Sequence, residues 1–114
     1  MKTAHNGFSL IEVMVVVAII GVLAAVSIPN IGKARLSSTR NVCIGNLRQI
    51  EAAKRIWALE KDKTIVDTPV DSELFGSINY LRDKPVCPAG GTYTINAISN
   101  YPSCSLSSTQ GHSL

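Results

Sequence analysis

The sequence has few aromatic residues and only two histidines, and both shortages limit the functions open to it. Aromatic residues make up 5% of the 114 residues, so a small domain built from this chain has a marginal core. His5 and His112 lie far apart and offer no pair at metal-ligand spacing. Gly90-Gly91 is not followed by the Lys-Ser/Thr pair of a phosphate-binding loop. We therefore expect neither an enzyme nor a cofactor.

Charge is missing from one long segment of the chain. From Phe8 to Ile28 the 21 residues are mostly apolar, and only Glu12 is charged. A helix of this length crosses a bilayer, at about 1.5 Å of rise per residue. Because a carboxylate is costly to insert into such a span, we expect Glu12 to have a function and a partner. The small residue Gly7 precedes the apolar run, whereas a secretory signal has its cleavage site after that run.

The residues around Gly7 resemble the processing site of a known family. Gly7, Phe8, Ser9-Leu10-Ile11 and Glu12 are similar to the cleavage and methylation site of type IV pilins and type II secretion pseudopilins. In that family a prepilin peptidase cuts after the glycine and methylates the new N-terminal residue, and the glutamate pairs with the terminal amine of a neighbouring subunit. The resemblance implies that Gly7 is the cleavage position, Phe8 the N-methylated residue and Glu12 the assembly residue.

The resemblance covers residues 7–60 and implies a structural subunit, a type IV pilin that polymerises through its N-terminal helix. Such a subunit lies in the inner membrane before assembly and in an extracellular pilus afterwards. The implied partners are further copies of the chain, the prepilin peptidase, an inner-membrane platform protein, an assembly ATPase and minor pilins. One alternative is a type II secretion pseudopilin in a periplasmic pseudopilus. A more distant alternative is a periplasmic binding or enzymatic domain with a signal anchor, which leaves Glu12 unexplained.

Positive charge is concentrated between Lys33 and Arg55, where six basic residues stand against Glu51 alone. Nucleic acid or acidic headgroups can bind such a segment. However, no aromatic residues alternate with the basic ones, as stacking on single strands requires. We favour a solvated helix face that meets acidic patches of the next subunit. The positive-inside rule, which counts Lys and Arg near the ends of the span, favours the opposite membrane orientation. We therefore place the leader in the cytoplasm on the basis of the processing motif and the cysteines.

The expected fold is α+β, with a long helix and a small head of two or three short strands and loops. We expect a leader (residues 1–7), a transmembrane and filament-core helix (8–29), its amphipathic continuation (30–60) and the C-terminal head (61–114). An apolar stripe on the continuation is predicted to dock the head, because its residues recur at helical spacing. The residues of this stripe are Leu36, Cys43, Leu47, Ile50, Ala53 and Trp57.

Three residues weaken the long helix. Pro29 removes a backbone donor and clashes with the preceding turn, and Gly21 and Gly32 add flexibility on either side. We therefore predict a kink or local melting at residues 25–32.

The head is expected to begin with a short helix capped by Asp71 or Ser72 and ended by Gly76. After it, residues 87–96 are predicted to form a turn that leads into a strand, and residues 102–106 to pair with that strand as a hairpin. Carboxylates at Asp67, Asp71 and Glu73 offer oxygen ligands for calcium, but acidic surface loops are the simpler interpretation.

Cys87 and Cys104 lie at the two edges of the predicted hairpin. A disulfide between them encloses about 16 residues and stabilises the head by roughly 3 kcal/mol. The resemblance supports this pairing, since many type IV pilins carry a late disulfide. Cys43 is expected to be a buried apolar residue, although it can also pair with one of the other two. Zinc held by Cys87, Cys104 and His112, with Cys43 or an acid as the fourth ligand, is the less favoured alternative, so we expect no metal.

Overall fold

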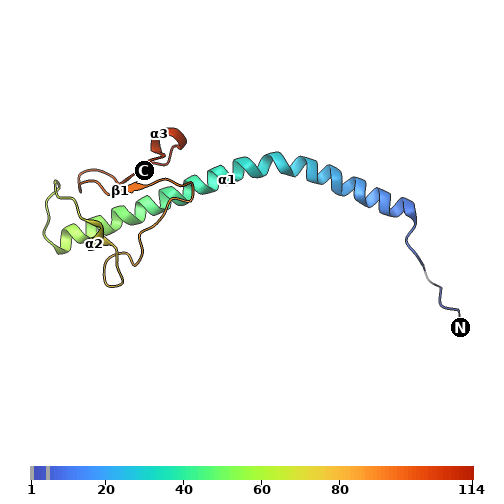
Figure 1. Cartoon of the computed structure of the whole chain (residues 1–114), viewed down its shortest axis with the longest axis horizontal. Helices are drawn as coiled ribbons and strands as arrows, with labels where there is room; N and C mark the ends of the chain where they lie inside the picture. The colour runs from blue at the N-terminus through green and yellow to red at the C-terminus, as the bar shows by residue number, and fades with distance from the viewer. Residues whose placement is uncertain (1, 5) are drawn as a thin grey trace. The chain divides into compact units, whose positions relative to one another are not determined.

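The computed structural model describes residues 2–4 and 6–114. Along the chain it contains the helices α1 (Leu10–Glu60) and α2 (Asp71–Leu74), the strands β1 (Tyr93–Thr94) and β2 (Ser103–Cys104), and the helix α3 (Ser107–Gln110) (Figure 1). The chain divides into two compact units, Met1–Arg35 and Leu36–Leu114. The α+β class is confirmed.

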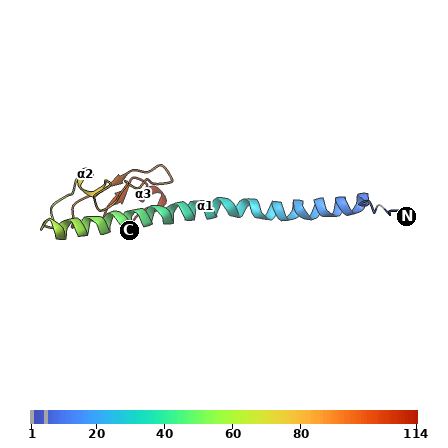
Figure 2. The same cartoon turned by 90° about the horizontal axis from the view of Figure 1, so that it is seen from below.

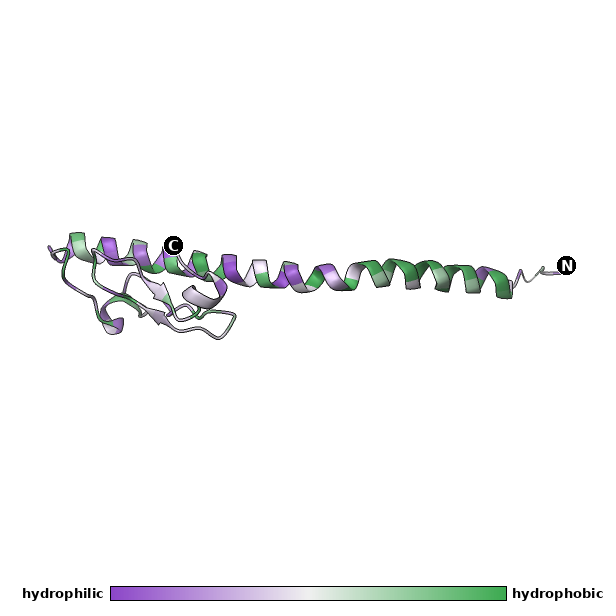
Figure 3. Ribbon diagram, turned by 90° about the horizontal axis from the view of Figure 1, so that it is seen from above, coloured by the Kyte–Doolittle hydropathy of each residue, from purple (hydrophilic) through white to green (hydrophobic). Residues whose placement is uncertain are grey.

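In the first unit, α1 is apolar and exposed. By length and composition this helix is able to cross a membrane, and its most apolar window is not buried. Figure 3 shows the apolar residues as a nearly unbroken run along this part of α1. The segment around Pro29 is helical throughout, so the predicted local melting of residues 25–32 is not seen. The contribution of Gly21, Pro29 and Gly32 to flexibility stays a prediction.

In the second unit, the short segments of the head pack on one side of the C-terminal part of α1 (Figure 2). The predicted docking stripe is confirmed at five positions but is wrong at Leu36, which is 68% exposed. The core combines this stripe with side chains from the loops and strands of the head. Its buried members are Cys43, Leu47, Ile50, Ala53, Trp57, Leu74, Cys87, Tyr93, Ile95 and Cys104.

The predicted hairpin is present in a minimal form. β1 and β2 pair antiparallel, with Tyr93 opposite Cys104 and Thr94 opposite Ser103. Each strand has only two residues, so sheet hydrogen bonds contribute little to holding the head. The short helix α3 that follows β2 was not predicted.

The cap of α2 differs from the prediction. The N-cap residue is Val70 rather than Asp71 or Ser72. The Val70 carbonyl accepts the Glu73 N–H at 3.0 Å, and the Glu73 carboxylate accepts the Val70 N–H at 3.4 Å. The glutamate therefore takes over the capping that a hydroxyl or aspartate at the N-cap usually provides.

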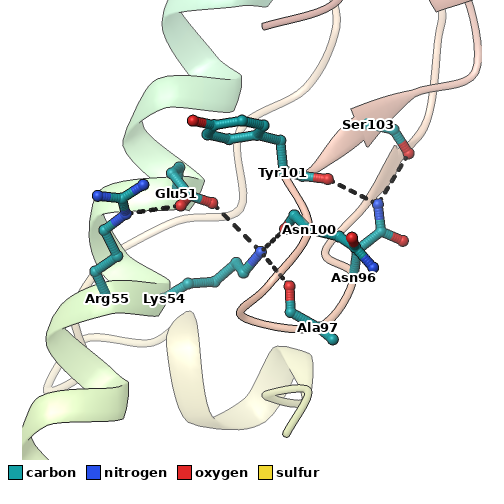
Figure 4. A network of polar contacts seen from close by, with 8 residues as sticks. All are labelled: Glu51, Lys54, Arg55, Asn96, Ala97, Asn100, Tyr101 and Ser103. Carbon is teal, nitrogen blue, oxygen red and sulfur yellow. Dashed lines mark hydrogen bonds and ion pairs between the residues drawn. The ribbon is translucent and has the colours of Figure 1, made fainter. Parts of the chain in front are cut away.

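Lys54 is a further correction, because it was assigned to the solvated basic face and is fully buried. Its Nζ donates to the carbonyls of Ala97 and Asn100 at 3.0 and 2.6 Å and lies 3.3 Å from Glu51 Oε2. Figure 4 shows this ammonium reaching from α1 into the loop between β1 and β2. On its exposed side, Glu51 also accepts from Arg55 Nε at 2.8 Å. A buried cation thus ties the loop to the helix.

Candidate functional site

The first candidate site is the N-terminal end of α1. Gly7 and Phe8 lie in a non-helical segment before the helix, and the Phe8 side chain is 89% exposed. An added Cβ at Gly7 meets no atom within 4 Å. The peptide bond between these two residues is therefore open to an enzyme, as the predicted processing requires.

Glu12 has a partner within its own chain. Its carboxylate accepts the Ser9 N–H at 2.9 Å, and its own N–H donates to Ser9 Oγ at 3.3 Å. This reciprocal pair is a capping box, which satisfies two of the free donors at a helix start. The negative charge also lies at the positive end of the helix dipole. Sequence analysis missed this contact, although the spacing of Ser9 and Glu12 is the signal for it.

The second candidate site lies in the head, where the three cysteines and His112 meet. Four buried residues each offer one ligand atom, and these four atoms lie within 4.8 Å of one another. The residues are Cys43, Cys87, Cys104 and His112. Cys87 Sγ is 3.6 Å from His112 Nδ1. His112 lies near the end of the chain, yet only 1% of it is exposed.

A tight turn shapes this cluster on the side of Cys87. Gly90 has a φ of +86°, which suits glycine, and its N–H donates to the Cys87 carbonyl at 3.0 Å. Burial raises the pKa of the Cys87 thiol, but hydrogen bonds from the backbone N–H groups of Ala89 and Gly91, assisted by His112 and Cys43, outweigh burial and lower that pKa to about 6. The turn is thus built to favour a thiolate.

Two polar side chains of α1 hold the surroundings of the cluster through three hydrogen bonds. Asn46 Nδ2 on α1 donates to Tyr93 Oη and to the Val86 carbonyl, both at 3.1 Å. Arg40 Nε on α1 donates to the Gly111 carbonyl at 2.9 Å, next to His112. These contacts tie the strand β1 and the C-terminal segment to the same helix that carries Cys43.

The structure holds all three cysteines as free thiols. It therefore does not contain the bridge predicted between Cys87 and Cys104, and that pairing stays a prediction.

The acidic residues considered for calcium do not gather into a site. Asp67 Oδ2 accepts from the Thr64 N–H and hydroxyl, Asp71 pairs with Lys84, and Glu73 caps α2. Among the described residues, the grouping of potential metal ligands consists of the cysteines and His112, without a carboxylate.

Comparison with known proteins places the first site in a family. A family model described as the prokaryotic N-terminal methylation motif matches residues 2–28. The chain is 44% identical to the type IV major pilin protein PilA of Myxococcus xanthus over 59 residues, which are 52% of this chain but 27% of that protein.

Two further relatives match over most of their length. The ComG operon protein 3 homolog of Bacillus licheniformis is 31% identical over 92 residues, covering 81% of this chain and 91% of that protein. Type II secretion system core protein G of Pseudomonas aeruginosa is 30% identical over 104 residues, covering 81% and 73%. No solved structure matches the chain. The chain therefore belongs to the family of type IV pilins and type II secretion pseudopilins, and the resemblance seen in its first residues is confirmed.

Proposed function

We propose that this chain is a filament subunit of the type IV pilin class, cleaved between Gly7 and Phe8 and assembled through α1. The observation that carries the proposal is the methylation motif at residues 2–28, which includes the exposed apolar start of α1 in the first unit. Exposed apolar surface of this extent needs lipid or other helices around it. The membrane covers it before assembly, and neighbouring copies cover it in the filament.

Glu12 would act in both environments. In the uncut chain its carboxylate satisfies the Ser9 N–H. Cleavage creates a charged amine at Phe8, and in the filament Glu12 pairs with the amine of a neighbouring copy. An unpaired carboxylate among apolar helices is costly. A subunit at the wrong axial position leaves such a charge behind, so the pairing sets the register of assembly.

The partners of this function follow from the same proposal. They are the prepilin peptidase, the inner-membrane platform protein, the assembly ATPase and minor pilins. The filament would be an extracellular pilus, reached from the inner membrane.

A pseudopilin of type II secretion is the second candidate function. It is supported by the match to core protein G of Pseudomonas aeruginosa, which extends into the head and covers 81% of this chain. The match to PilA covers only 52%. In this case the filament would be a short periplasmic one, with the same helix contacts.

The mass and N-terminus of the mature chain test the proposal. A filament subunit begins at N-methylated Phe8 and lacks Met1–Gly7 in cells that have the peptidase, and it keeps the leader when the peptidase is deleted. Electron microscopy of surface filaments, together with a secretion assay in a deletion strain, then separates pilin from pseudopilin. Retention of Met1, or cleavage downstream of Ala25, contradicts the filament function.

A further inference from the structure

We propose that Cys43, Cys87, Cys104 and His112 bind one zinc ion in a tetrahedral site that fastens the head to α1. The proposal concerns the second unit alone, so its test is independent of the filament function.

The spacing of the four groups fits zinc. Bonds of about 2.3 Å to sulfur and 2.0–2.1 Å to nitrogen place the ligand atoms of a tetrahedral site roughly 3.5–3.8 Å apart. The Cys87 Sγ to His112 Nδ1 distance is 3.6 Å, and all four ligand atoms lie within 4.8 Å of one another. A shift of less than about 1 Å therefore completes the geometry.

The chemistry of the donors selects the ion. Three thiolates and one imidazole form a set that zinc takes in structural sites, with no position left for water or substrate. Calcium and magnesium require oxygen ligands, and the group contains none. All four residues are buried, as a closed structural site requires.

The surroundings support a metal-bound thiolate. Backbone N–H groups of Ala89 and Gly91 point at the Cys87 sulfur, and such donors offset the net negative charge of one zinc with three thiolates. At Gly91 an added Cβ would lie 2.6 Å from Cys104 Sγ. The backbone at Gly91 is therefore so close to the cluster that a larger residue would clash with it.

A disulfide explains fewer features of this cluster than a zinc ion does. A bridge between any two of the cysteines leaves the third as a buried thiol and gives His112 no role. Zinc uses all four groups at once, and it explains why a histidine with 1% exposure points a ring nitrogen at a sulfur.

The site joins four separate parts of the second unit. Cys43 lies on α1, Cys87 on the turn before β1, Cys104 on β2, and His112 beyond α3. A head with two-residue strands has few backbone hydrogen bonds to hold it, and small domains of this kind often depend on a metal. We therefore expect zinc removal to loosen the whole head.

The test uses the full mature chain, purified in detergent micelles without chelator and analysed for metals by mass spectrometry. We expect one zinc per chain in the natural protein and in Ser113→Ala, an exposed neighbour of His112 that serves as the matched control. His112→Ala should lose most of the zinc, whereas His112→Cys should retain it through a fourth thiolate. This rescue separates ligation from a purely structural role of the histidine.

Three further measurements complete the test. Cobalt added to the chelated protein should give the intense visible absorption of a tetrahedral thiolate site, and zinc should bleach it. Chelation should lower the melting temperature of the natural chain, and zinc should restore it. Alkylation in denaturant should label three thiols. Absence of zinc, a different metal at stoichiometric level, or an intramolecular disulfide in the freshly purified chain would overturn the proposal.

Discussion

Glu12 makes one hydrogen bond that the uncut chain already contains and one ion pair that only the proposed filament supplies. The first needs an acceptor oxygen, and the second needs a negative charge. Glutamine keeps the acceptor and removes the charge, so substitutions at this residue separate the two functions.

We predict that Glu12→Gln leaves cleavage after Gly7 intact but strongly reduces filament assembly. Glu12→Ala should lose assembly as well, and its helix start should also be weaker by about 1 kcal/mol because the capping box is gone. Mass spectrometry reports cleavage, and sheared filament yield reports assembly. The matched control is Ser9→Ala, which breaks the hydroxyl half of the box but keeps the charge and should still assemble. Normal filaments from Glu12→Gln would refute the pairing.

Lys54 determines how the loop between β1 and β2 is held. Lys54→Met keeps a long apolar stem but leaves two carbonyls and Glu51 without the ammonium. We expect a loss of roughly 2–4 kcal/mol in the free energy of unfolding. The control is Lys61→Met, which removes the same charge from an exposed position and should change stability by less than about 0.5 kcal/mol. Chemical denaturation measures the free energy of unfolding of both variants. Equal losses would contradict the role of Lys54 in holding the loop.

At the scale of elements, the head depends on loops that pair with each other. The segment from Thr64 to Asp67 receives backbone hydrogen bonds from Ile98 and Ser99, since the Ile98 N–H donates to the Asp67 carbonyl and the Ser99 N–H to the Ile65 carbonyl. The Asp67 carboxylate holds this turn by accepting the Thr64 N–H and hydroxyl at 2.7 and 2.9 Å.

Acid should weaken this turn. The hydrogen bonds from the Thr64 N–H and hydroxyl lower the pKa of Asp67, so folding favours its ionised form. The resulting stability is present above the unfolded pKa of about 3.9 and is lost as the pH falls through the lower folded value. We predict that the melting temperature of Asp67→Asn falls less steeply than that of the natural chain below about pH 4. Parallel pH dependences would show that the turn does not depend on the carboxylate.

At the scale of the whole molecule, the two compact units have different requirements. The first exposes its apolar helix, whereas every buried core residue in the described part of the chain belongs to Leu36–Leu114. We predict that a fragment of residues 36–114, supplied with zinc, folds without detergent and gives a dispersed NMR spectrum. In this fragment Trp57→Ala should cost about 3–5 kcal/mol and unfold the head, whereas Leu59→Ala, at an exposed position, should not. Aggregation of the natural fragment would show that the head needs the first unit.

How much was predictable differs between the two units. The length of an apolar run, a small residue before it and a glutamate within it are local properties, so they can be recognised without knowledge of the fold. The docking stripe was also readable for five of its six residues, because helical spacing determines which side chains share a face. The prediction failed at Leu36 because the apolar face of α1 continues beyond the part that the head covers.

The head was less predictable, because its contacts join positions far apart in the chain. His112 follows Cys43 by 69 residues, and no local pattern links them. Lys54 looked like one more exposed base, since a charged residue is rarely buried without partners. Besides Glu51 on the same helix, its partners are two backbone carbonyls of the head, which have no signature in the sequence.

The sequence by itself determined the family and the apolar helix, and it predicts the cleavage site, because each depends on neighbouring residues in one dimension. Only the tertiary structure decided that three cysteines and a histidine meet, that Lys54 is buried and that Glu12 caps its own helix. The physical reason is that the ligand cluster and the contacts of Lys54 with the Ala97 and Asn100 carbonyls exist only when folding brings together groups that the sequence keeps apart. For Glu12 the spacing was visible, but the direction of its carboxylate was set by the helix.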